Sequence, residues 1–82
     1  MYRIVTENKN LEVVKSILRR ENVDFTMYNA TGSWKGVEEP SLVLEFEGYG
    51  PEKILAVALA IKYENKQEAV ILQTIPVETK FI

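Results

Sequence analysis

Eight consecutive apolar residues, Ile54 to Ile61, constrain the fold of this chain more than any other feature. The run is too short to span a membrane, which takes about 20 apolar residues, so other protein surfaces have to cover it. Pro51 suits a first helical turn, and Glu52 suits the positive end of a helix dipole. The sequence therefore predicts a helix over residues 51–63 that is apolar nearly all round and needs cover on more than one side.

The chain has few means of providing that cover. Its 82 residues make one domain, residues 1–82, and a domain of this size buries only about 60–65% of the surface that its unfolded chain exposes. Cysteine and histidine are both absent, so neither disulfides nor a zinc site with those ligands can add stability. Self-association is the remaining aid, and we expect a homo-oligomer.

Strand and helix periodicities alternate along the rest of the chain. Residues 2–7 alternate with a period of two, which predicts a strand, and residues 11–20 carry apolar side chains at the three- and four-residue spacing of an amphipathic helix. Residues 24–30 are rich in strand formers, and residues 42–47 alternate cleanly. We predict that these two stretches form an antiparallel hairpin, with the intervening glycines and polar residues as its loop.

The last predicted strand begins at Val70, after the second helix, and Pro76 predicts a bend or a sheet edge because it cannot donate to a ladder. The order is therefore strand, helix, strand, strand, helix, strand. Right-handed crossovers turn this order into an α+β ferredoxin-like βαββαβ sandwich, with a four-stranded antiparallel sheet and both helices on one face. Residues 77–82 alternate again, which leaves open a short fifth strand at the C-terminus.

Several functional classes are disfavoured by composition. The formal net charge is −2, whereas proteins that bind nucleic acid polymers usually carry a basic excess that neutralises phosphates. Without histidine or cysteine no Ser-His-Asp or Cys-His catalytic arrangement is possible, and the glycines match no dinucleotide or nucleoside-triphosphate motif. Met1 opens into a charged, alternating segment and not into a signal peptide. We expect a cytoplasmic, non-catalytic protein that has no cofactor and binds neither membranes nor nucleic acid.

One pair of carboxylates keeps a catalytic alternative open. Glu45 and Glu47 project from the same face of a predicted strand, where two carboxylates can bind a divalent cation or act as acid and base. The plainer interpretation is a solvated sheet face, because strands of antiparallel sheets commonly turn polar residues outward. We therefore place an enzyme built on this pair last among the hypotheses.

The segment around the only tryptophan is the best candidate for a binding site. Trp34 lies between Gly32 and Gly36, where the backbone can approach a ligand closely, and its ring offers a stacking plane. A second interpretation is structural, with the glycines serving a bend or bulge and the ring packed on a neighbour. The candidate ligand-binding residues of this segment are Thr31, Ser33, Trp34 and Lys35.

Three stretches together resemble known proteins. Phe25-Thr26-Met27-Tyr28 is similar to the strand that enters the signalling loop of PII proteins. Trp34-Lys35-Gly36, followed by Glu38-Glu39 and Leu42-Val43-Leu44, is similar to the tryptophan-containing hairpin of CutA proteins. Ile75-Pro76-Val77-Glu78 is similar to the last strand of PII. The chain thus resembles the PII-like and CutA-like superfamily, which implies a ferredoxin-like core assembled as a trimer, with ligand clefts between subunits.

The resemblance implies an architecture more than an activity. In PII proteins a glycine-rich loop between the second helix and the last strand binds nucleotide phosphates, and the corresponding residues here, Tyr63 to Glu68, contain no glycine. CutA proteins are associated with divalent metal, for which this chain has no histidine or cysteine ligand. By the same comparison, Lys80 would reach the ligand cleft of a neighbouring subunit.

Two functional hypotheses remain ahead of the catalytic one. The first is a non-catalytic trimer that binds or sequesters a small anionic or nucleotide-like molecule between its subunits, through Thr31, Ser33, Trp34, Lys35 and Lys80. The alternative is a protein-interaction module or small inhibitor, such as a phage-encoded counter-defence protein. It would act by covering a partner's surface or by extending the partner's β-sheet.

Overall fold

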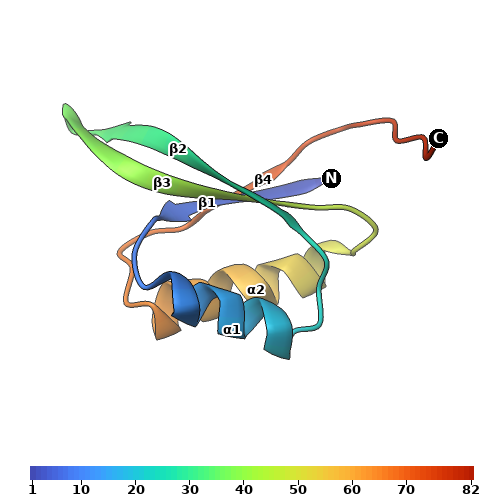
Figure 1. Ribbon diagram of the computed structural model, residues 1–82, viewed down its shortest axis with the longest axis horizontal. Helices are drawn as coiled ribbons and strands as arrows, with labels where there is room; N and C mark the ends of the chain where they lie inside the picture. The colour runs from blue at the N-terminus through green and yellow to red at the C-terminus, as the bar shows by residue number, and fades with distance from the viewer.

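The computed structural model describes residues 1–82 as two layers, a four-stranded antiparallel sheet with two helices against one of its faces (Figure 1). This confirms the predicted α+β class, the antiparallel sheet and the number of strands and helices. In chain order the elements are β1 (Tyr2–Glu7), α1 (Leu11–Arg20), β2 (Thr26–Trp34), β3 (Val37–Phe46), α2 (Pro51–Glu64) and β4 (Ile71–Thr74).

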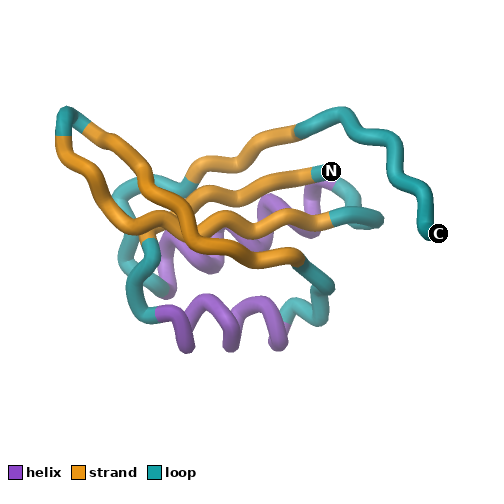
Figure 2. The backbone as a smooth tube through the Cα atoms, turned by 45° about the horizontal axis from the view of Figure 1, so that its top comes forward, coloured by secondary structure: helices purple, strands orange, loops and turns teal.

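The sheet has the strand order β2-β3-β1-β4, so β1 and β3 are central and β2 and β4 are the edges (Figure 2). In the register of β1, Ile4 lies opposite Leu44 of β3 and Leu72 of β4. Residues directly opposite each other in antiparallel strands share a face. The alternation within β1 therefore decides the orientation of three strands at once.

The hydrophobic core lies between the sheet and the helices. The sheet contributes Ile4, Leu44 and Phe46, which are essentially inaccessible to solvent. The amphipathic face of α1 packs against them, as its three- and four-residue spacing predicts. Each fully buried side chain of this kind stabilises the fold by about 1.5–3 kcal/mol. The helical core residues are Val14, Ile17, Leu18, Ile54, Val57, Ala58 and Ile61.

The second helix is confirmed, but within one chain it is covered on one side only. Ile54 and Ile61 face the core, whereas Leu55, Leu59 and Tyr63 remain 49%, 43% and 69% exposed. Neither α1 nor α2 combines the length and the apolar character that a membrane crossing requires.

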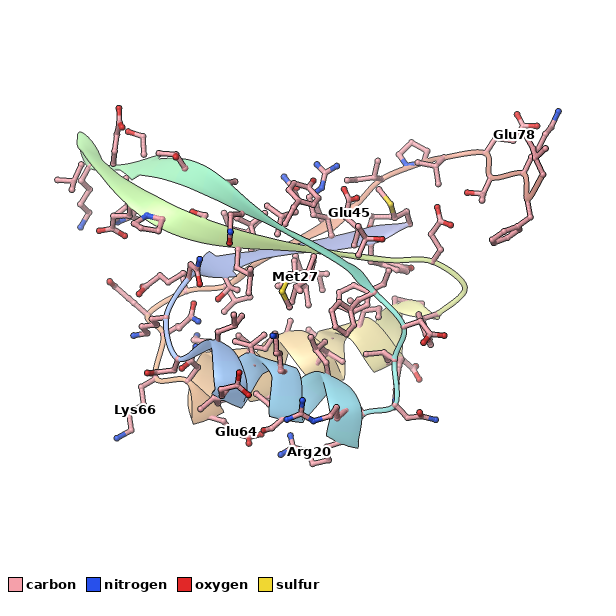
Figure 3. The ribbon with its side chains drawn as sticks, viewed as in Figure 1. Arg20, Met27, Glu45, Glu64, Lys66 and Glu78 are labelled. Atoms are coloured by element: carbon pink, nitrogen blue, oxygen red, sulfur yellow. The ribbon has the colours of Figure 1, made fainter.

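The last residue of each helix takes part in an ion pair on the surface, in which the side chains of Arg20 and Glu64 meet (Figure 3). Arg20 donates two hydrogen bonds to the carboxylate of Glu64, at 2.9 and 2.6 Å. These hydrogen bonds and the charge of Arg20 lower the pKa of Glu64, and the same contact raises the pKa of Arg20. A lowered carboxylate pKa stabilises the fold above the pKa of the unfolded chain, and this contribution is lost as the pH falls through the folded value. Because the pair is exposed, the contribution is small.

The predicted hairpin loop is wrong, because the strands run almost to the tip. β2 ends at Trp34 and β3 begins at Val37, which leaves a two-residue turn. Both turn residues have positive φ, 51° at Lys35 and 78° at Gly36, as the tight turns of hairpins require. Gly32, the other glycine of the predicted loop, lies within β2 and does not end the strand.

Pro40 also lies inside a strand, where a proline normally disrupts pairing. Its carbonyl accepts a hydrogen bond from the Asn8 backbone N–H at 3.2 Å, so this peptide edge faces β1 and not β2. The pairing of β1 with β3 ends at Glu7 opposite Ser41, so no partner lacks a donor at Pro40. A proline disrupts a strand only when its nitrogen lies on a hydrogen-bonded edge. At Pro40 that edge is beyond the end of the β1 pairing, so the strand continues through the proline.

The optional fifth strand does not form within the chain. Ile75 exchanges backbone hydrogen bonds with Met1 at 2.8 and 3.1 Å, and no later residue of the chain pairs with a strand. Residues 76–82, called the C-terminal tail below, leave the sheet and extend away from it (Figure 1). Phe81 and Ile82 are fully exposed there.

Two single isoleucine-to-valine variants, one at a buried and one at an exposed position, test the assignment of the core. We expect Ile4→Val to lower the free energy of unfolding by about 0.5–1.5 kcal/mol, because Ile4 is fully buried. The matched control Ile71→Val, on the neighbouring strand but 50% exposed, should change it by less than about 0.5 kcal/mol. Urea denaturation in dilute solution measures both. An equal loss at the two positions would contradict the assignment of Ile71 to an open face.

Candidate functional site

The β2–β3 hairpin continues beyond the end of β1 as a two-stranded arm. Glu7 of β1 lies opposite Ser41, so residues 31–40 pair as strands only with each other, and the hydrogen bond from the Asn8 N–H to the Pro40 carbonyl is the last contact with the β1 side. This hairpin arm bends away from the helices, toward the face of the sheet that they leave open (Figures 1 and 2). The bend makes the open face concave next to the arm.

A hollow of about 480 Å³ occupies this concave region, between the hairpin arm and the ends of β1 and β4. We call it the trough. Its walls come from β1, the hairpin arm, Ser41 in the body of β3, the connection from α2 to β4, and the first residue of β4. The lining residues are Val5, Thr6, Glu7, Gly32, Ser33, Trp34, Glu39, Ser41, Glu68, Ala69 and Ile71.

The floor of the trough is apolar, and its end at the tip of the hairpin arm is aromatic. Val5 and Ile71 lie opposite each other on β1 and β4. Trp34 lies two residues beyond Gly32 on the same face of β2, and its side chain is 61% exposed. A Cβ at Gly32 would come within 2.6 Å of the Ser41 hydroxyl oxygen, so glycine leaves room for that hydroxyl.

The charged residues that line the trough are all acidic. Glu7, Glu39 and Glu68 line it, and no lysine or arginine does. Glu7 forms a loose ion pair with Lys9 at 3.5 Å, whereas Glu39 and Glu68 form none. Carboxylates beside an apolar wall favour a cation at the site and disfavour an anion. No three acidic side chains lie close enough together to hold a metal ion.

Buried amide side chains hold the edge of the trough in place. Thr6 Oγ1 donates a hydrogen bond to Gln67 Oε1, which also accepts one from the Glu7 backbone N–H at 3.1 Å. Asn65 Nδ2 donates to the Lys9 carbonyl at 3.0 Å. These contacts tie the connection before β4 to the end of β1 and so position Glu68. Gln67 Nε2 is buried without a hydrogen-bond partner.

The predicted site residues are only partly brought together. Ser33 and Trp34 line the trough, whereas Thr31 and Lys35 do not. Lys80 belongs to the C-terminal tail, at the opposite end of the molecule from the hairpin arm (Figure 1). Within one chain it therefore cannot act with the other four.

Sequence reasoning missed the other half of the site. Val5 and Ile71 lie in predicted strands and Ser41 lies in the predicted hairpin loop, and nothing in those patterns says that the outward face is hollow. The acids Glu39 and Glu68 looked like ordinary residues of polar loops. The one available signal was the apolar character of outward-facing residues in β1 and β4, which is unusual for a solvated sheet face.

The two carboxylates considered for catalysis are each engaged separately on the open face. Glu45 Oε2 accepts hydrogen bonds from Arg3, at 3.0 Å from Nε and 2.8 Å from Nη2, and from the Tyr28 hydroxyl at 3.1 Å. Glu47 accepts a hydrogen bond from Thr79 of the C-terminal tail at 2.8 Å. Desolvation, together with the hydrogen bond to Glu45 and its negative charge, raises the pKa of Tyr28. This cluster is therefore an ion pair with a tyrosine partner and not an open two-carboxylate site.

No protein-family model matches this chain, and no curated protein matches it. The likeness to PII-like and CutA-like proteins accordingly remains a prediction from short stretches of sequence.

Replacing Glu45 tests the open-face cluster. We expect Glu45→Gln to lower the pKa of Tyr28, because the variant loses the carboxylate charge and leaves the Arg3 cation unpaired beside the phenol. The pKa should fall only part of the way to its ordinary value, since desolvation of the ring remains. NMR titration of the tyrosine ring measures the change. Glu47→Gln, two residues along β3, is the control, and an equal fall in that variant would contradict the contact.

Proposed function

We propose that this protein is a non-catalytic binding protein and that the trough holds a small molecule with a cationic group on an apolar body. The observation that carries the proposal is the combination of an exposed Trp34, an apolar floor and three lining carboxylates with no lining cation. No histidine or cysteine is present to support nucleophilic chemistry. Binding is therefore the activity that these side chains support best.

Each part of the trough has a separate role in this proposal. Trp34 offers its face to a cation, an interaction worth about 0.5–1 kcal/mol when exposed and about 2 kcal/mol or more when desolvated. Val5 and Ile71 cover the apolar part of the ligand, at about 25 cal/mol for each Å² removed from water. Glu39 and Glu68, which have no cationic partner within the chain, neutralise the ligand's charge.

The sequence-based hypothesis of an anionic or nucleotide-like ligand receives less support. Three carboxylates would repel a phosphate group at this position. Lys35 is next to Trp34 in the turn of the hairpin arm but does not line the trough, and Lys80 could contribute only from another copy. A nucleotide site would need at least one more subunit to supply its positive charge.

Binding measurements separate these ligand classes. In a titration of the wild-type protein by calorimetry, we expect arylalkylamines such as tryptamine, which are protonated at neutral pH, to bind and ATP and AMP not to bind. Glu39→Gln and Glu68→Gln should each weaken amine binding about three- to tenfold, which corresponds to about 0.7–1.4 kcal/mol. The control Glu78→Gln in the C-terminal tail should bind as the wild type does. Tight binding of nucleotides with no response to amines would overturn the proposal.

We further propose that the fold is ferredoxin-like and that copies of the chain associate, with the trimer implied by the resemblance as the arrangement to test. The element order β-α-β-β-α-β and the strand order β2-β3-β1-β4 support the fold assignment. Association is supported by β2, an edge strand of nine residues that contains neither a charge nor a proline. Natural edge strands are usually protected by such residues against pairing with other chains.

The C-terminal tail is the part of the chain best suited to pair with that edge. Val77, Thr79 and Phe81 alternate with polar residues as in a strand, yet no strand of their own chain pairs with them. A tail that adds to β2 of the next copy makes a head-to-tail contact, and such contacts close into rings when the rotation allows. The alternative function, a protein-interaction module, would use the same β2 edge to receive a strand of a different protein.

A proline placed on the free edge of β2 tests this association. Thr31 lies opposite Pro40, whose peptide faces β1, so the Thr31 N–H points away from β3. Thr31→Pro should therefore remove an intermolecular donor while leaving the β2–β3 ladder intact. By light scattering, we expect a multiple of 9.4 kDa for the wild type and for Thr31→Ala, and a lower mass for Thr31→Pro and for a chain ending at Ile75. A wild-type mass of 9.4 kDa in dilute solution would contradict the trimer and favour the interaction module.

A further inference from the structure

The side of α2 that points away from the core is a continuous apolar surface. Leu55, Leu59 and Tyr63 are four residues apart and Ala56 is three residues before Leu59, which places all four on one side of the helix. We call this surface the α2 outer face. The three larger side chains are 43–69% exposed, and no other element of the chain covers them. It lies on the helical layer, on the other side of the molecule from the trough and the open sheet face (Figure 1).

The core is filled by the opposite side of α2, so the apolar residues of the α2 outer face are not needed to complete the core. Ile54, Val57 and Ile61 already fill the space under the sheet and are fully buried. The flank toward α1 is closed by the Arg20–Glu64 ion pair. Surface helices normally carry charged or polar residues on the side that faces away from the core. Two leucines and a tyrosine spaced about one turn apart on that side of α2 therefore indicate a surface that is covered in an assembly.

The charges at the two ends of the α2 outer face identify its occupant. Glu52 lies one turn before Leu55, at the N-terminal end, and the exposed Lys53 next to it lies on the flank toward α1, because it is three turns before Glu64 on the same side of the helix. Lys62 lies at the other end, with its Nζ 5.6 Å from the centre of the Tyr63 ring, and Lys66 follows just after the helix. A second α2 that ran parallel would place acid against acid and base against base. An antiparallel second α2 places the acid of each copy at the basic end of the other, which is favourable.

We propose that two copies of this chain dock through their α2 outer faces, antiparallel and related by a two-fold axis that passes near Ala56. Leu55 of each copy packs on Leu59 of the other, and Glu52 of each copy approaches Lys62 and Lys66 of the other. The contact is isologous, because the same surface is used on both copies. It is independent of the trough and of the β2 edge, so a ring formed through β2 would be doubled by it into a two-layered assembly.

Single cysteines test the contact and its direction, because the natural chain has none. The background is the Thr31→Pro variant, which removes association through β2. Under mild oxidation we expect Ala56→Cys to form a disulfide-linked dimer readily, because the two-fold axis brings the two positions within the 4.4–6.8 Å between Cα atoms that a disulfide requires. Glu52→Cys should link at least tenfold more slowly, because the antiparallel arrangement separates its two copies. Equal linking at both positions would overturn the antiparallel docking.

Charge reversal gives a second readout that leaves the core untouched. In sedimentation equilibrium we expect Glu52→Lys to raise the dimer dissociation constant at least threefold. Adding Lys62→Glu and Lys66→Glu to the same chain should restore it, because every cross-contact then has opposite charges again. Leu59→Glu, which places an acid within the apolar contact, should abolish the dimer with an unchanged circular dichroism spectrum. Failure of the triple variant to recover, or a Leu59→Glu variant that still dimerises, would overturn the proposal.

Discussion

The two-layer arrangement determines what the rest of this molecule can do. Two helices cover one face of a four-stranded sheet, and each helix contributes one side to that contact. A chain of this size has nothing left with which to cover the other sheet face, the outer side of α2 or the edge of β2. Each of these surfaces nevertheless carries apolar or unpaired groups. The proposed functions are therefore consequences of what a single copy leaves uncovered.

The hairpin arm turns one of these uncovered surfaces into a site. Because β2 and β3 outrun β1, the arm is free to bend over the open face, and the bend brings Trp34 above Val5 and Ile71. Glycine at position 32 leaves room for the Ser41 hydroxyl at the base of the arm. The buried amides of Asn65 and Gln67 hold the opposite wall of the trough against the end of β1 through hydrogen bonds.

Much of this structure could be predicted from periodicity. The alternation in residues 2–7 and 42–47 and the helical spacing in residues 11–20 gave the elements, their order and their core-facing residues, since burial of one face imposes these periods directly. The hairpin arm could not be predicted in the same way. Gly32 and Pro40 are strand breakers by local rules, and only the pairing of each peptide edge shows that both are compatible with a strand here. Ser33 and Trp34 were identified as site residues by their unusual neighbourhood, whereas Thr31, Lys35 and Lys80 were not brought to the same hollow.

The sequence by itself determined the α+β class, the two helices, the core and the absence of histidine and cysteine chemistry, because these depend on residue type and local period. Only the tertiary structure decided which residues meet in the trough and what charge they give it. Val5, Glu39, Glu68 and Ile71 come from four separate segments, and their proximity depends on strand register and on the bend of the hairpin arm. Such contacts between distant segments arise from the packing of whole elements, so no local pattern in the chain records them.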